Sequence, residues 1–144
     1  MNTTNKKNSK IQNFTSLECY NELSKSLNSY LIDVRTKTEW IFVGVPDLSS
    51  INKNVIFVSW LNYPYMQINS FFENQIMEFN IYKNDKLFFL CRSGNRSYSA
   101  AEFLTSRGFS NCFNVIDGFE GELNSNHQRS TINGWKFNNL PWEQ

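Results

Sequence analysis

A short segment near residue 90 combines a nucleophile with groups that bind anions. It reads CRSGNRS over residues 91–97 and directly follows the apolar run KLFFL. A cysteine thiolate is nucleophilic, two arginines add positive charge, and a glycine allows a backbone in which successive amides curl around an anion. We expect a helix to begin near Ser97, so its free N–H groups would also point into the loop. We therefore interpret this segment as an anion-binding loop whose surroundings favour the thiolate form of Cys91.

The plainer interpretation is a buried structural cysteine followed by a solvated basic turn. Three features together favour the reactive loop instead. Four residues separate Cys91 from Arg96, Gly94 lies between them, and a helix is expected to follow.

The elements around this loop alternate between strands and helices. Such alternation predicts right-handed crossovers and a mainly parallel sheet with helices on both faces. Ligands bind such sheets beyond the carboxyl ends of the strands, where Cys91 would lie. Apolar runs predict strands over 30–34, 54–60, 86–91 and 111–115, and KIQNF (10–14) is predicted to be an edge strand. Apolar spacing predicts a helix over about 16–27 and another within 68–81. A third helix is expected to follow Cys91 and end at Gly108, and a short fourth helix is expected to stop before Pro141.

The first of these helices has a clear start signal. Thr15 stands three residues before Glu18, which is the spacing of a capping box. Leu17, Tyr20, Leu23 and Leu27 recur at helical spacing and predict this helix, on which Cys19 is expected to face outward or to be half-buried.

Length and composition indicate one domain in a reducing compartment. The chain has 144 residues, and we expect a disordered polar segment over 1–9 and a single domain over 10–144. With 14 basic and 13 acidic residues, the charge does not indicate a nucleic-acid partner. No apolar run suggests a membrane span or a signal peptide. Three widely spaced cysteines without a CxxC pair argue against disulfides and zinc, and suit the cytoplasm.

Several segments in order resemble the rhodanese family of sulfurtransferases, and single-domain bacterial members in particular. The likeness covers about residues 11–142 and implies the rhodanese-like three-layer fold with a five-stranded, mainly parallel central sheet. The segments that carry the resemblance are LIDVRTKTEWIFVGVPDL (31–48), LFFLCRSGNRSYSAAEFLTSRGF (87–109), NVIDGFEGE (114–122) and GWKFNNLPW (134–142).

The resemblance implies a two-step sulfur transfer that needs no metal or other cofactor. Cys91 would take the outer sulfur of thiosulfate or a similar small anion as a persulfide, then pass it to cyanide, a thiol or a protein sulfur carrier. Asp33 and Arg35 match a supporting pair that ties loops beneath the site. Arg92 is the residue expected to contact the donor, whereas Arg96 either faces the anion or braces the loop. The implied substrate-binding residues are Arg92, Ser93, Gly94, Asn95, Arg96 and Ser97.

Two other functions remain as alternatives. A phosphatase or arsenate reductase of the same fold is less favoured, since cysteine phosphatases have one more residue between the cysteine and the arginine. A binding or regulatory module is less favoured because Cys91 and both arginines are present. A monomer is expected.

Two further residues have no fixed role in this interpretation. Cys112 is expected to be an inert buried side chain, with a resolving role toward Cys91 as the alternative. His127 is the single histidine, and a contact with Arg129 at the rim of the site is its one candidate role.

Overall fold

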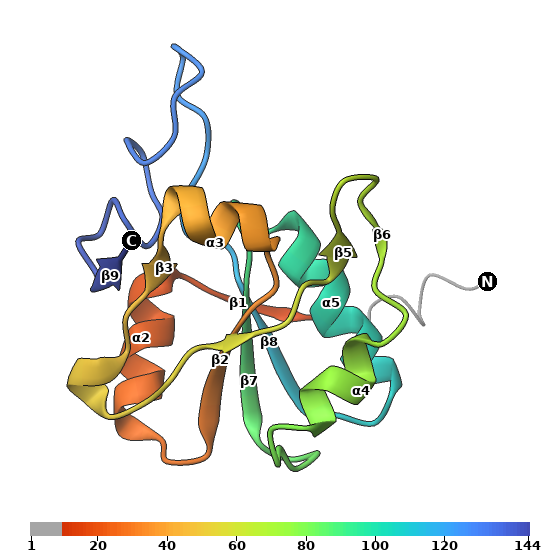
Figure 1. Cartoon of the computed structure of the whole chain (residues 1–144). Helices are drawn as coiled ribbons and strands as arrows, with labels where there is room; N and C mark the ends of the chain where they lie inside the picture. The colour runs from red at the N-terminus through yellow and green to blue at the C-terminus, as the bar shows by residue number, and fades with distance from the viewer. Residues whose placement is uncertain (1–9) are drawn as a thin grey trace.

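A five-stranded, all-parallel sheet forms the centre of the computed structural model, which describes residues 10–144 (Figure 1). The expected disordered segment 1–9 lies outside the described residues. The strands are β1 (Gln12–Phe14), β2 (Ser29–Asp33), β4 (Ile56–Phe57), β7 (Lys86–Leu90) and β8 (Asn111–Val115), in the spatial order β1-β8-β7-β2-β4. The predicted three-layer α/β fold is confirmed, and KIQNF does contribute an edge strand.

The central strand β7 is buried on both faces. Leu87 and Phe89 belong to one hydrophobic cluster and Phe88 and Leu90 to the other, because successive side chains of a strand point to opposite faces. Helices α4 (Phe72–Met77) and α5 (Asn95–Ser106) cover the first face, whereas α2 (Ser16–Lys25) and residues near the C-terminus cover the second. This double covering explains why KLFFL is a continuous apolar run.

The predicted capping box of α2 is present, but the predicted outward or half-buried position of Cys19 is wrong. Cys19 is fully buried with Leu23, whereas Leu17 is 53% exposed. The helix ends at Lys25, so Leu27 lies beyond it and is 89% exposed. The small side chains of Ser16 and Cys19 are both fully buried, Ser16 in a hydrogen bond to Asp117 and Cys19 in the hydrophobic cluster, and the leucine pattern does not reveal this.

Helix α3 (Lys37–Val43) was not predicted from the sequence. Its start carries the same signal as α2, since Thr36 and Glu39 form a second capping box. It ends at Gly44, where φ is 101°, and the segment looked irregular in sequence because Gly44 and Pro46 follow so closely. Figure 1 shows α3 across the end of the sheet at which β7 leads into α5.

Other boundaries differ where strands lie at an edge or where the chain turns. The predicted strand 54–60 is reduced to the two residues of β4. The helix predicted before Pro141 does not form. Residues 117–141 instead form turns, bends and irregular segments, held by backbone hydrogen bonds such as that from the Trp135 amide to the Gly118 carbonyl. The remaining elements are β3 (Val45–Pro46) paired with β9 (Trp142–Glu143), β5 (Leu61–Asn62) paired with β6 (Gln67–Ile68), and the 3-10 turn η1 (Ser49–Ile51).

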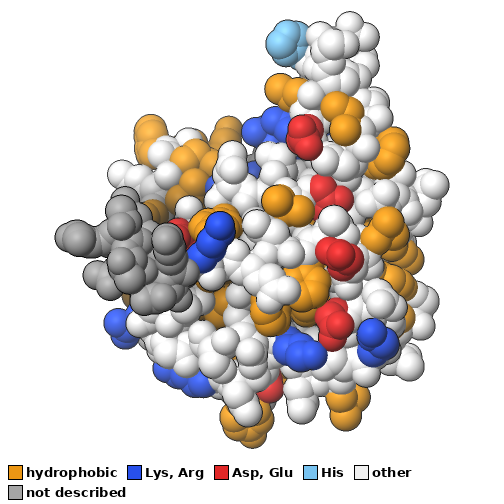
Figure 2. All heavy atoms as spheres, turned by 180° about the vertical axis from the view of Figure 1, so that it is seen from behind, with side chains coloured by type: hydrophobic (Ala, Val, Ile, Leu, Met, Phe, Trp, Pro, Cys, Tyr) orange, Lys and Arg blue, Asp and Glu red, His pale blue; other side chains and the backbone are white. Residues whose placement is uncertain are grey.

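The surface carries both signs of charge without a single dominant patch on the face in Figure 2. The segment 121–133 projects from the body of the molecule, with the histidine side chain at its far end. None of the helices within residues 10–144 is long and apolar enough to cross a membrane.

Candidate active site

Cys91 stands directly after β7, and its sulfur is surrounded by donors from the start of α5. The Gly94 amide lies 3.1 Å from Sγ and the Ser97 amide 3.3 Å. The Ser97 hydroxyl is also 3.1 Å from Sγ. Cys91 is 1% exposed, so these bonds form in a dry setting where electrostatic effects are strong. The predicted loop therefore curls around the sulfur.

Gly94 is required by this curvature. Its φ is 108°, in the range that glycine tolerates, and a Cβ there would collide with the Ile116 carbonyl oxygen. The helix begins one residue later, at Asn95, slightly earlier than the sequence predicted.

The segment after β8 holds the loop from its other side. The Phe119 amide donates to the Cys91 carbonyl at 2.8 Å, and the Glu120 amide donates to the Arg92 carbonyl at 3.0 Å. The backbone of Gly118 passes so close to the loop that a Cβ at Gly118 would collide with the Arg92 carbonyl oxygen. Backbone bonds from the segment after β8 thus hold the first two residues of the loop.

Arg96 is paired with a carboxylate of α3. Its guanidinium donates to Glu39 Oε1 at 2.7 Å and to Oε2 at 2.8 Å, a two-bond pairing of fixed geometry. Burial by itself would raise the pKa of Glu39, but Arg96, together with Thr36, lowers it to about 2. This geometry fits the bracing role for Arg96. By contrast, Arg92 is exposed and forms no ion pair within the described residues.

Asp33 and Arg35 lie fully buried at the end of β2. The guanidinium donates to the carboxylate at 2.7 Å and to the Gly44 carbonyl at 2.9 Å, and it lies 4.3 Å from the centre of the Phe119 ring. Since Asp33 pairs with Leu90 in the sheet, this ion pair lies one residue from Cys91 across the strands. It links α3, β2 and the segment after β8, and its role as a supporting pair of the site stays a prediction.

Asn114 was missed by the sequence analysis. It is 2% exposed on β8, and its Oδ1 accepts a 2.6 Å hydrogen bond from the Ser97 hydroxyl. Its amide nitrogen donates to the Gly94 carbonyl and to Asn13 Oδ1. One signal in the sequence could have revealed Asn114. A polar asparagine occupies a position of the predicted strand 111–115 whose side chain points to the buried face of the sheet.

The other cysteines and the histidine lie outside this group of contacts. Burial raises the pKa of Cys112 to about 11, and burial, with the nearby Asp117 charge, raises that of Cys19. His127 is exposed in the projecting segment, and Arg129 donates to the Gly121 carbonyl. The contact between His127 and Arg129 at the rim of the site stays a prediction. Within residues 10–144 no three metal-ligating side chains cluster.

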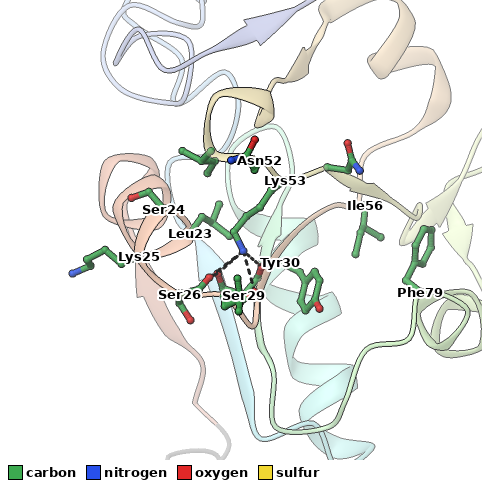
Figure 3. Close-up of a pocket in the computed structure, with 13 residues that line it drawn as sticks. Leu23, Ser24, Lys25, Ser26, Ser29, Tyr30, Asn52, Lys53, Ile56 and Phe79 are labelled. Carbon is green, nitrogen blue, oxygen red and sulfur yellow. Dashed lines mark hydrogen bonds between the residues drawn. The ribbon is translucent and has the colours of Figure 1, made fainter.

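A pocket of about 540 Å³ lies at the opposite end of the sheet (Figure 3). It borders the start of β2 and the end of α2. Lys53 lines this pocket, and its ammonium donates to the carbonyls of Ser26 and Ser29 (Figure 3). The bonds tie the C-cap of α2, Ser26, to the first residue of β2, Ser29, which is a structural role.

A parallel α/β sheet with a cysteine cradled by amides at a strand end is the arrangement that the resemblance to the rhodanese-like class implied. A model of the STR4 middle domain matches residues 12–144. An uncharacterized protein of Rickettsia conorii is 46% identical over 137 residues, covering 92% of this chain and 98% of that protein. A crystal structure of a protein from M. tuberculosis has a TM-score of 0.85 at 40% identity, covering 94% of this chain and 98% of that one.

The term rhodanese-like is part of the name of a more distant relative. The chloroplastic rhodanese-like domain-containing protein 4 of Arabidopsis thaliana is 24% identical over 123 residues, covering 85% of this chain and 24% of that protein. The chain therefore belongs to the family of the STR4 middle domain and is rhodanese-like.

Proposed function

We propose that this protein is a sulfurtransferase that carries sulfur as a persulfide on Cys91. The observation that carries the proposal is the pair of backbone amides, from Gly94 and Ser97, aimed at a buried sulfur at a strand end. Amides placed in this way stabilise negative charge on sulfur without having to reorganise during the reaction.

The reaction has two displacement steps. The Cys91 thiolate attacks the outer sulfur of thiosulfate, a new S–S bond forms, and the bond to the sulfonate sulfur breaks with its electron pair, releasing sulfite. An acceptor, cyanide or a thiolate, then attacks the outer sulfur of the persulfide. With cyanide, thiocyanate leaves and the Cys91 thiolate is restored, so no external oxidant or reductant is needed.

The proposed roles follow the loop. Arg92, exposed and without an ion-pair partner in the described chain, contacts the anionic donor, while Arg96 and the pair of Asp33 and Arg35 hold the loop in shape. Ser93, Gly94, Asn95 and Ser97 contribute the amides of the binding loop. We further propose that residues 10–144 act as one monomeric domain in the cytoplasm, with a small thiol or a protein sulfur carrier as the cellular acceptor.

Intact mass spectrometry tests the proposal directly. Wild-type protein is incubated with thiosulfate, desalted and compared with Cys91→Ser. The expected result is the gain of one sulfur atom in wild type alone, removed by cyanide with formation of thiocyanate. No sulfur gain on folded wild type from thiosulfate, polysulfide or a persulfide donor contradicts the proposal, and turnover of an aryl phosphate instead would favour the phosphatase alternative.

A further inference from the structure

The direction of each hydrogen bond around Asn114 can be assigned from its partners. The Gly94 carbonyl is a fixed acceptor 3.1 Å away, so the Asn114 nitrogen must face it. The Asn114 oxygen therefore faces the Ser97 hydroxyl, 2.6 Å away, and can only accept. Asn13 Oδ1 takes the second N–H of Asn114 at 2.9 Å, which completes the assignment.

This assignment fixes how Ser97 meets Cys91. A serine hydroxyl has one proton, and here that proton is donated to Asn114. Toward Sγ, 3.1 Å away, Ser97 thus presents only lone pairs. In this arrangement Cys91 must be the donor, as a thiol.

We propose that Asn114 is a positioning residue that holds the Ser97 hydroxyl as an acceptor for the Cys91 thiol, so that a thiolate forms only when this hydroxyl turns from Asn114 to Sγ. Turning leaves Asn114 Oδ1 without its donor in a site that is 2% exposed. Loss of the hydrogen-bond partner of a buried polar atom costs free energy. Asn114 therefore opposes the amides of Gly94 and Ser97, which favour the thiolate.

The consequence for catalysis rests on the proposed persulfide chemistry. In a persulfide the negative charge lies on the outer sulfur and Sγ is no longer an anion. The Ser97 hydroxyl can then turn back and donate its hydrogen bond to Asn114 Oδ1 again. The pair of Ser97 and Asn114 thus disfavours the free thiolate but not the loaded form, and so favours retention of the sulfur.

A thiolate titration tests the proposal and needs no sulfur transfer. Ultraviolet absorbance of the thiolate is recorded against pH for each variant and its own Cys91→Ser counterpart. We expect Asn114→Ala to lower the pH midpoint by about one unit, which is about tenfold more thiolate below the midpoint, because the freed hydroxyl can donate to the anion. In a Ser97→Ala background the same substitution should cause no further shift.

Matched controls isolate this effect. Asn111→Ala removes another asparagine of β8, whose side chain bonds the Asn84 carbonyl far from the site, and should leave the midpoint unchanged. The charged groups around Cys91 stay constant in every variant; they include Arg92, Arg96, Glu39, Asp33, Arg35, Asp117 and Glu120.

Two results overturn the proposal. One is an unchanged or raised midpoint in Asn114→Ala, and the other is a downward shift that persists in the Ser97→Ala background. A second measurement covers the case in which Asn114→Ala does not fold. Below the midpoint, the infrared S–H stretch of Cys91, identified by its loss in Cys91→Ser, should move to higher frequency in Ser97→Ala, and an unchanged band contradicts the S–H donor assignment.

These readouts separate the two proposals. Failure of sulfur loading with the expected titration shifts removes the persulfide function and leaves the Asn114 assignment intact. Normal loading with unshifted titrations does the reverse.

Discussion

Glu39→Gln should weaken the fold at neutral pH and have little effect in acid. The Glu39 carboxylate holds the start of α3 through Thr36 and bonds Arg96 twice. Its side chain is 20% exposed and that of Arg96 17%, so solvent screens the pair only in part. Lowering the pKa of Glu39 from 4.5 to about 2 corresponds to about 3 kcal/mol of stability at neutral pH. Glutamine keeps a neutral hydrogen bond, so the expected loss is about 2 kcal/mol.

The sign of the pH dependence follows from the direction of that shift. A carboxyl whose pKa is lower in the folded state stabilises fully above its unfolded pKa, and the stabilisation is lost as the pH falls toward the folded value. The window here runs from about pH 4.5 down to about pH 2. At pH 3 about 60% of the contribution is gone, so wild type and Glu39→Gln should differ by less than about 1 kcal/mol.

Urea unfolding followed by tryptophan fluorescence measures this difference at pH 7 and pH 3. Glu73→Gln is the matched control, because Glu73 pairs with Arg107 at the surface, where the arginine side chain is 55% exposed. An exposed pair contributes about 0–1 kcal/mol. A Glu39→Gln deficit that is the same at both pH values, or no larger than that of the control at pH 7, would refute the reasoning.

Three further outcomes are expected from the loop and its surroundings. Gly94→Ala should lower the free energy of unfolding in urea by about 2 kcal/mol or more and abolish sulfur loading, because a side chain at φ 108° collides with the Ile116 carbonyl; wild-type loading would contradict the loop geometry. Arg92→Ala should raise the thiosulfate KM about tenfold or more with an unchanged melting temperature; an unaltered KM in thiocyanate assays would remove Arg92 from donor binding. Because burial raises the pKa of Cys112 to about 11, Cys112→Ser should load sulfur within about twofold of wild type by intact mass, whereas loss of loading would make Cys112 a partner of Cys91.

The parts of the fold that the sequence predicted are those encoded by neighbouring residues. KLFFL specifies a strand buried on both faces, and β7 forms there. The Thr15 and Glu18 box specifies the start of α2. Cys91, Gly94 and the following helix lie within a few residues of one another, so their arrangement depends on local geometry.

What the sequence did not predict depends on contacts between distant segments. Glu39 and Arg96 are 57 positions apart, and Ser97 and Asn114 are 17 apart on different elements. Hydrophobic periodicity on α2 included Leu17 and left Cys19 outside the pattern, yet Leu17 is exposed and Cys19 packs in the core against residues of distant segments. The predicted C-terminal helix failed for a similar reason, since long-range backbone bonds hold that segment in turns.

The ion pairs determine which charge is left for an anionic donor in the proposed reaction. Arg96 is neutralised by Glu39, and Arg35 by Asp33, so neither guanidinium presents a full free charge. The exposed Arg92 and the loop amides then provide the attraction that remains. If the proposed reaction holds, such a site would attract thiosulfate, and the sulfite product would meet only one positive side chain, which would favour its release. Glu39→Gln should therefore increase anion retention as well as weaken the fold, and product inhibition by sulfite, stronger in this variant than in Glu73→Gln, would measure the first effect separately from the second.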